Sequence, residues 1–266
     1  MSTYWKHKTV WITGASSGIG EALSQQLAAR GAHLILSSRS EEKLNQVCST
    51  LPNSNMHKVL ALDVSNQEDL ERVLSDSKKI TKTVDVLINN AGISQRALTW
   101  EANQQSERLI METNFFGSIR LAKEVLPNMI LRNFGLIINI SSVVGKFGFP
   151  LRSSYAASKH ALHGYFDTLR AEAQAEKKNI NVLMVCPGRI ATNISLSAVV
   201  ADGSKQNEMD PGLSNGLTPE YCAKRIIKAA EKGKSEIYIG KEQLLIYLKR
   251  YFPGIFRKLV SKFKPK

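Results

Sequence analysis

Thr13-Gly-Ala-Ser-Ser-Gly-Ile-Gly20 follows a short apolar run and leads directly into an amphipathic helical pattern. Glycine adopts positive φ freely and lets a phosphate come close to the backbone, so Gly14, Gly18 and Gly20 suit a tight turn between a strand and a helix. The start of the helix adds unpaired N–H groups and a positive dipole end, which favour a pyrophosphate. The stretch therefore predicts a dinucleotide site on an α/β sheet. A glycine-rich turn without a ligand is the alternative.

Short apolar runs alternate with longer helical patterns along the whole chain. Strands are predicted at Thr9–Thr13, His33–Ser37, Val59–Leu62, Val84–Asn89, Leu136–Ser141, Val182–Cys186 and Ile237–Ile239. Helices are predicted near residues 18–30, 41–50, 66–79, 103–133, 154–178 and 218–232. This alternation predicts a single α/β domain over residues 1–240. Its core would be a doubly wound, mostly parallel seven-stranded sheet of the Rossmann type, with helices on both faces.

The net charge of +13 is concentrated near the C-terminus. Residues 241–266 hold eight lysines and arginines against one glutamate, which is more than half of the excess. A basic body built to bind nucleic acid is therefore not predicted. The chain begins without the apolar core of a signal peptide, and no apolar run is long enough to cross a bilayer. Cys48, Cys186 and Cys222 show no metal or disulfide spacing, so we expect a reducing, cytoplasmic location and no metal site.

Two segments depart from the alternation of strands and helices. Residues 193–217 contain three glycines and a proline, and we expect them to form a mobile lid loop. In the basic tail 241–266, apolar residues recur at helical spacing, and Pro253-Gly254 should divide the pattern into two short helices. The tail has two interpretations: it packs on the domain or on another subunit, or it attaches peripherally to an anionic membrane.

The end of the second predicted strand bears on the choice of cofactor. An NAD site usually has a carboxylate there for the ribose 2′-hydroxyl, but this chain has Ser37-Ser38-Arg39-Ser40. The planar guanidinium of Arg39 can pair with the 2′-phosphate of NADP. We therefore predict NADP, and NAD held through Glu41 or Glu42 is the alternative.

Tyr155 and Lys159 lie one turn apart at the start of a predicted helix. An ammonium near a phenol favours the phenolate, so we expect Lys159, together with a positively charged nicotinamide, to lower the pKa of Tyr155 toward neutrality. The tyrosine would then exchange a proton with a carbonyl or alcohol oxygen. A buried strand ends in Ser141-Ser142, where a serine can hydrogen-bond the same oxygen. A surface pair and a turn serine are the alternatives.

Together these motifs resemble the short-chain dehydrogenase/reductase family over about residues 8–240. The resemblance implies catalytic roles for Asn114, Ser142, Tyr155 and Lys159, and the asparagine is expected to bend a helix and help hold a relay water. Besides Tyr155 and Lys159, the implied cofactor contacts are Gly14, Ser16, Ser17, Gly18, Ile19, Gly20, Arg39, Asp63, Val64, Asn90, Ala91, Gly92, Pro187, Gly188, Ile190 and Thr192. The stretch Phe149–Ala161 is similar to the microsomal dehydrogenase/reductase and hydroxysteroid dehydrogenase branch.

The resemblance implies an NADP-dependent oxidoreductase that moves hydride between nicotinamide and a carbonyl or secondary alcohol. It also implies a homodimer or homotetramer that pairs through the helices near 103–133 and 154–178. The candidate residues for the pocket walls are Ser94, Trp100, Val143, Phe149 and Met209. Most of them are apolar, which favours a hydrophobic substrate. Trp100 and Met209 fit a core or loop position equally well. The alternatives are a non-catalytic nicotinamide sensor or scaffold at a membrane, and an epimerase or dehydratase on the same fold.

Overall fold

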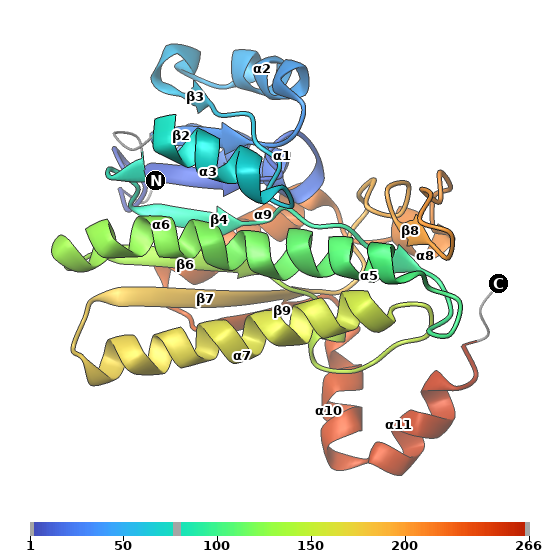
Figure 1. Cartoon of the computed structure of the whole chain (residues 1–266). Helices are drawn as coiled ribbons and strands as arrows, with labels where there is room; N and C mark the ends of the chain where they lie inside the picture. The colour runs from blue at the N-terminus through green and yellow to red at the C-terminus, as the bar shows by residue number, and fades with distance from the viewer. Residues whose placement is uncertain (1–2, 77–80, 264–266) are drawn as a thin grey trace.

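A seven-stranded parallel sheet occupies the centre of the molecule, which the computed structural model describes for residues 3–76 and 81–263. The strand order is β3-β2-β1-β4-β6-β7-β9, and each neighbouring pair is parallel. The strands are β1 (Thr9–Thr13), β2 (His33–Ser37), β3 (Lys58–Val59), β4 (Val86–Asn89), β6 (Gly135–Ile140), β7 (Ile180–Pro187) and β9 (Glu236–Ile239). The predicted doubly wound sheet is therefore confirmed (Figure 1).

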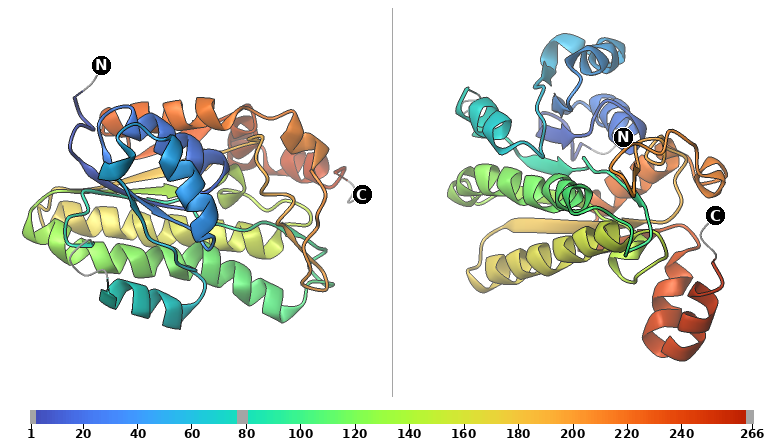
Figure 2. Two further views of the ribbon diagram at one scale, coloured as in Figure 1. Left: turned by 90° about the horizontal axis from the view of Figure 1, so that it is seen from above. Right: turned by 45° about the vertical axis from the view of Figure 1, so that its right-hand side comes forward.

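Helices cover both faces of the sheet (Figure 2). One face carries α1 (Gly18–Ala28), α2 (Glu41–Thr50) and α9 (Pro219–Glu231), and the other carries α3 (Gln67–Asp76), α5 (Gln104–Met111), α6 (Gly117–Leu131) and α7 (Ser153–Ala175). Strand β1 serves both layers because its side chains alternate: Val10 and Ile12 join the first core, and Trp11 joins the second. Strands buried on both faces explain the nearly continuous apolar runs in the sequence.

The order of the sheet reverses at β1, which has β2 on one side and β4 on the other. Connections from these strands leave toward opposite faces, and such a reversal opens a crevice at the carboxyl ends of the strands. Strands β1, β4, β6 and β7 all end at this edge because they are parallel. Side chains that follow these four strands are therefore brought together.

The third predicted strand is shorter than expected, but its pairing continues. After β3 ends, the amides of Leu60 and Leu62 still donate to the carbonyls of Leu36 and Ser38 at 2.9 and 3.0 Å. The helix predicted over 66–79 is present as α3, and residues 77–79 lie outside the described part of the chain. Short 3₁₀ turns occur at Ser54–Met56 and Val143–Gly145.

The segment 193–217, predicted as a lid loop, is tied to the body of the protein. Its strand β8 (Val199–Val200) pairs in parallel with β5 (Gln95–Arg96), and the helix α8 (Pro211–Ser214) follows. This small second sheet was not predicted, because two-residue strands have no periodic pattern. The segment lies over the carboxyl edge of the main sheet, where β8 and α8 are seen in Figure 1.

The tail forms two short helices that project from the body (Figure 1). They are α10 (Gln243–Tyr251) and α11 (Pro253–Val260), so the predicted division at Pro253-Gly254 is confirmed. The buried ring of Phe256 packs against the ring of Phe147, with their centroids 5.4 Å apart. Within residues 3–76 and 81–263, no helix has both the length and the apolar character needed to cross a bilayer. Residues 264–266 lie outside the described part of the chain.

Candidate active site

A cavity of about 1630 Å³ lies at the carboxyl ends of the strands. Pockets for a single small molecule usually measure about 300–1,000 Å³, so this one has room for a dinucleotide and a second ligand. Of the residues predicted from the sequence, the cavity is lined by Gly14, Ser16, Ser17, Gly18, Ile19, Arg39, Asp63, Val64, Asn90, Ala91, Gly92, Ser142, Tyr155, Lys159, Pro187, Gly188, Ile190 and Thr192. The structure thus brings nearly all of them to one place; Gly20 and Asn114 lie behind the wall.

The glycine turn has the geometry that a bound pyrophosphate requires. Gly14 and Gly18 adopt φ of +64° and +57°, the left-handed region that favours glycine. A Cβ at Gly20 would lie 2.2 Å from the carbonyl oxygen of Gly14, so this third glycine permits close packing instead of ligand contact. Ser17 precedes α1, and its side chain makes no capping bond to the helix. The first N–H groups of α1 therefore remain available for an anion, and the turn fits a dinucleotide phosphate.

The far end of the cavity is basic. Arg39 and Lys43 line it, whereas Glu41 and Glu42 do not. Arg39 is exposed and has no hydrogen-bond or ion-pair partner among the described residues. Lys43 was missed from the sequence, although its place one helical turn after Arg39 was a usable signal. Arg39 and Lys43 line this wall while Glu41 and Glu42 do not, and two cations there suit a ribose phosphate better than a ribose hydroxyl.

Asn114 lies in a π-helical turn, Glu112–Phe116, that divides the helix predicted over 103–133. Its buried side chain accepts a hydrogen bond from the amide of Ile93 at 2.8 Å, and it donates to the Ile93 carbonyl and the Ser158 hydroxyl at 3.0 Å each. These bonds tie the loop after β4 to helix α7. The π-helical turn interrupts the helix at Asn114, the residue expected to bend it. Asn114 itself does not line the cavity.

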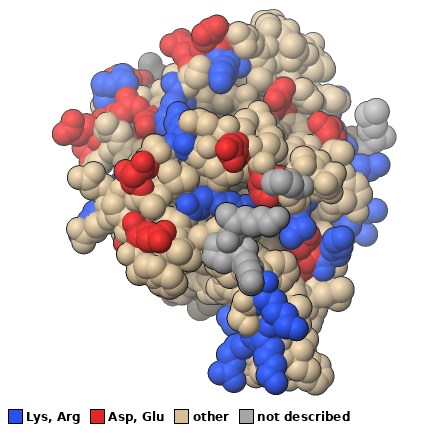
Figure 3. Space-filling model, turned by 90° about the vertical axis from the view of Figure 1, so that its right-hand side faces the viewer, with Lys and Arg blue, Asp and Glu red and all other residues tan. Residues whose placement is uncertain are grey.

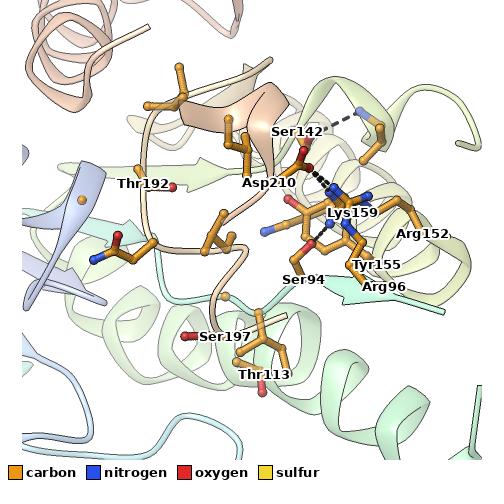
Figure 4. A pocket seen from close by; sticks show the side chains of 18 of the residues that line it. Ser94, Arg96, Thr113, Ser142, Arg152, Tyr155, Lys159, Thr192, Ser197 and Asp210 are labelled. Atoms are coloured by element: carbon orange, nitrogen blue, oxygen red, sulfur yellow. Dashed lines mark hydrogen bonds and ion pairs between the residues drawn. The ribbon is translucent and has the colours of Figure 1, made fainter. Parts of the chain in front are cut away.

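Ser142, Tyr155 and Lys159 lie close together in the substrate half of the cavity (Figure 4). Ser142 follows β6, and the other two residues share one face of α7. The ammonium of Lys159 lies 5.8 Å from the centroid of the Tyr155 ring and donates to the carbonyl of Ile140 at 2.8 Å. Both side chains are buried, so an acid and a cation are held beside the glycine turn.

The sequence predicts that Lys159, together with a positively charged nicotinamide, lowers the pKa of Tyr155; for the protein alone the pKa of Tyr155 is raised. Burial raises the pKa of the phenol, opposed by the positive charge of Arg152 and by a hydrogen bond from Ser142. Burial also lowers the pKa of Lys159 itself to about 8, and its ammonium is bonded to a backbone carbonyl. Tyr155 is therefore a protonated phenol at neutral pH, the form that can donate a proton.

Another wall of the cavity comes from the end of β7 and the segment after it, where Pro187, Gly188, Ile190 and Thr192 line the cavity. Thr192 packs close to the glycine turn, because a Cβ at Gly18 would lie 3.0 Å from its methyl group. This contact places the predicted nicotinamide segment beside the predicted phosphate turn.

The predicted pocket walls are mostly in place. Ser94, Val143, Phe149 and Met209 line the cavity, but Trp100 does not: it is 80% exposed. Sequence reasoning missed two groups of lining residues. One is a charged group near Tyr155, formed by Arg96, Arg152 and Asp210. The other comes from the C-terminal tail and consists of Glu242, Leu245 and Phe263. They carry no motif, and only the folded chain shows them together.

A cluster of ligand-type side chains lies behind Ser141. Ligand atoms of His163, Cys186 and Glu236 are within 4.8 Å of one another. The ammonium of Lys146 is 2.7 Å from the carboxylate of Glu236, so this carboxylate already has a cation beside it. Burial lowers the pKa of His163 to about 4, and the ring is neutral at pH 7.

Comparison with known proteins identifies the class. The family model for short chain dehydrogenases matches residues 8–200. A Bos taurus protein named dehydrogenase/reductase SDR family member 7B is 38% identical over 270 residues, covering 98% of this chain and 82% of that protein. The chain therefore belongs to the short-chain dehydrogenase/reductase family, a family of oxidoreductases.

Two solved structures share the fold. A short-chain dehydrogenase from Sphingobium yanoikuyae in complex with NADPH has a TM-score of 0.77 and 24% identity, over 97% of this chain and 96% of that one. A short-chain dehydrogenase/reductase from Burkholderia phymatum in complex with NAD has a TM-score of 0.82 and 21% identity, over 100% of this chain and 98% of that one. At this identity the likeness shows the fold alone.

Proposed function

We propose that this protein is an NADP-dependent oxidoreductase that transfers hydride between nicotinamide and a carbonyl or secondary alcohol, with Tyr155 as the acid/base. The observation that carries the proposal is one cavity that joins the glycine turn to Ser142 and to the buried Tyr155 and Lys159. Burying a phenol and an ammonium costs stability. A sensor or scaffold that only bound nicotinamide would not need a buried phenol and ammonium, which lower its stability.

The residues of this chain divide the chemistry among them. The nicotinamide cofactor, when bound, supplies or takes the hydride. The protonated hydroxyl of Tyr155 donates to the carbonyl oxygen, and Ser142 hydrogen-bonds the same oxygen and orients it. After the proton has left, the positive charges of Lys159 and Arg152 stabilise the phenolate. Burial favours the protonated phenol, which is the form that donates a proton to a carbonyl oxygen.

The preference for NADP follows from the basic end of the cavity. Arg39 and Lys43 line that wall, and both are suited to a 2′-phosphate. The similar Sphingobium enzyme holds NADPH, whereas the Burkholderia enzyme holds NAD, so the relatives support a nicotinamide cofactor of either kind. The lining residues of this chain favour the phosphorylated form.

The tail combines features of the two interpretations drawn from the sequence, packing on the domain and contact with a membrane. Phe256 packs on the body, but the outer apolar side chains are exposed: Leu244, Tyr247, Tyr251, Phe252, Ile255 and Leu259. Lysines and arginines gather over this projecting lobe (Figure 3). Exposed apolar groups beside cations suit the surface of an anionic membrane. We therefore propose peripheral membrane contact through α10 and α11.

A panel of apolar aldehydes and ketones with NADPH or NADH tests the proposed function. We expect loss of reduced cofactor with several carbonyls and a preference for NADPH. Firm binding of NADPH with no turnover on any member would instead favour the sensor or scaffold.

A further inference from the structure

Two partly buried arginines meet one carboxylate in the cavity, close to Tyr155. Arg96 lies on β5, Arg152 immediately precedes α7, and Asp210 belongs to the segment 193–217. Both guanidinium groups pair with the same oxygen, Oδ2 of Asp210, and the Arg152 contact is 3.6 Å. The side chains of Arg96, Arg152 and Asp210 are only 20%, 13% and 20% exposed. Figure 4 shows the three together beside Tyr155.

The charges of this group do not balance. Two cations share one carboxylate, and neither arginine has a second ion pair among the described residues. The other oxygen of Asp210, Oδ1, accepts a hydrogen bond from the amide of Gly212 at 3.0 Å, which caps α8. Burial and the nearby charge of Arg96 lower the pKa of Arg152 to about 10. A positive charge is thus kept in a partly buried place without full compensation, which is costly unless an anion joins it.

The two arginines differ in how firmly they are held. Arg152 donates to the hydroxyl of Ser94 and to the carbonyl of Gln95, so its guanidinium has a fixed position. Arg96 has no described partner except Asp210, although a guanidinium offers five N–H donors. Most of its donors are therefore available to a ligand in the cavity that it lines.

The position of the pair relates it to the reacting group. The central carbon of the Arg152 guanidinium lies 5.9 Å from the centroid of the Tyr155 ring. An anion held by this group would thus be only a few bonds away from a carbonyl that receives the proton of Tyr155. Phe149, Met209 and Leu245 also line the cavity, and their apolar side chains suit a hydrocarbon portion.

We propose that the substrate is an amphiphilic carbonyl compound with an anionic group, a carboxylate or a phosphate, which Arg96 and Arg152 bind near the reacting carbon. The inference rests on the proposed function, since it names the substrate class of that site. Guanidinium forks recognise both anions through paired N–H bonds. In the free protein the carboxylate of Asp210 pairs with both arginines. When the anion binds, it takes over N–H donors that Asp210 held, which couples the segment 193–217 to substrate binding.

Matched substrates provide the first test. The kcat/KM of a long-chain γ-oxo carboxylate is compared with that of its methyl ester, and the phosphate monoester of a long-chain α-hydroxy ketone is compared with the free hydroxy ketone. We expect one or both anions to exceed their neutral partners by about 10- to 100-fold, the range of a charge-assisted hydrogen bond. The anion with the larger ratio of anionic to neutral kcat/KM, carboxylate or phosphate, is the one that the site prefers.

Variants then assign the preference to the arginines. Arg96→Met should reduce the ratio of anionic to neutral kcat/KM toward one, and Arg96→Lys should restore part of it. Asp210→Asn keeps a capping oxygen for α8 but removes the competing charge, so the KM of the anionic substrate should fall. The matched control is Arg225→Met, because Arg225 is an arginine on α9 whose guanidinium bonds the hydroxyl of Tyr221 and lies outside the cavity.

A binding measurement separates this inference from the proposed function. Decyl phosphate and decanoate are tested for thermal stabilisation of the NADPH-loaded protein, with decanol as the neutral probe. Reduction of neutral ketones without any anion preference, and no Arg96-dependent binding, would overturn the inference and leave the reductase proposal standing. If no carbonyl is reduced at all, the reductase proposal fails. The anion site then stands if the anions bind wild type and not Arg96→Met, and it falls if they do not.

Discussion

The phenol of Tyr155 has 9% of its surface exposed, and it lies between a cation on its own helix, Lys159, and a second cation at the start of that helix, Arg152. Burial keeps the proton on the oxygen in the resting state. In the mechanism that we propose, the neighbouring cations act at the next stage, because their charges stabilise the phenolate that forms when the proton moves. A residue of this kind is a better proton donor than acceptor at neutral pH.

The charge of Lys159 should make kcat depend on pH, because it stabilises the phenolate of Tyr155. Burial lowers the pKa of its ammonium to about 8, so the charge is present below that pH and is lost as the pH rises through it. Without the charge the phenolate is less stable, and kcat for carbonyl reduction should fall by up to about tenfold for each pH unit above about 8. The kcat–pH profile checks this, with circular dichroism at each pH to show that the fold is retained. A flat profile across the two units centred on pH 8 would contradict it.

We expect Arg39 to set the preference between the two nicotinamide cofactors. Arg39→Asp removes the partner of the 2′-phosphate and adds a carboxylate for the 2′-hydroxyl. The kcat/KM with NADPH should fall by about 10- to 100-fold, and that with NADH should rise or hold. Arg72→Asp on α3, outside the cavity, is the control. An unchanged NADPH to NADH ratio in Arg39→Asp would refute the role of Arg39.

Elements differ in how far the sequence reveals them. β1 and β2 have the bounds predicted from their apolar runs, because strands buried on both faces leave a continuous signal. β5 and β8 have two residues each and leave none, yet their pairing brings Arg96 and the segment of Asp210 to the substrate end of the cavity. The glycine turn and the Tyr155–Lys159 spacing are local in sequence, so they were predictable. Arg96, Arg152 and Asp210 are isolated charges in the sequence, and only the tertiary fold joins them.

The helices α10 and α11 make the proposed membrane contact testable. Removing the whole tail would also remove Leu245 from the cavity and Phe256 from Phe147, so substitution on the exposed side is cleaner. The double variant Phe252→Ser and Ile255→Ser changes side chains that are 58% and 60% exposed. We expect sedimentation with phosphatidylserine-containing vesicles to decrease by at least about tenfold in affinity, since about 1.5–3 kcal/mol is lost for each fully buried apolar side chain.

Two comparisons complete this test. Leu131→Ser, an exposed apolar position at the end of α6, should leave sedimentation unchanged. Vesicles of phosphatidylcholine alone should bind more weakly than anionic ones, because each basic group near an anionic surface contributes about 1 kcal/mol. Equal sedimentation of the double variant and the wild type would remove the tail from membrane contact.

The positive charge of the tail and the cavity lie at the same end of the protein. The tail helices carry most of the cationic lobe in Figure 3, and Leu245 and Phe263 from the tail line the cavity. With the membrane contact that we propose for the tail, an apolar substrate dissolved in the membrane would leave it beside the cavity. The opposite surface, formed by α6 and α7, contains an apolar hollow lined by Leu126, Ile130 and Leu169.

This hollow leads to a prediction about assembly. Ile130 is 42% exposed at the hollow, and a second copy of α6 and α7 could cover it in a symmetric pair. We expect light scattering to give a dimer or tetramer, and Ile130→Glu to shift the mass toward the monomer because it buries an unpaired charge. Ile255→Glu on the tail, also exposed, should keep the wild-type mass. A wild-type monomer at micromolar concentration would exclude the pairing.

The proposed role of Tyr155 is tested by the turnover of Tyr155→Phe on a carbonyl that the wild type reduces with NADPH. Removing only the hydroxyl should lower kcat by about 10²- to 10⁴-fold, while the Kd for NADPH stays within about threefold. Tyr165→Phe, on the same helix but outside the cavity, should keep wild-type turnover. Wild-type kcat in Tyr155→Phe would contradict the account, because the proton would then come from another group.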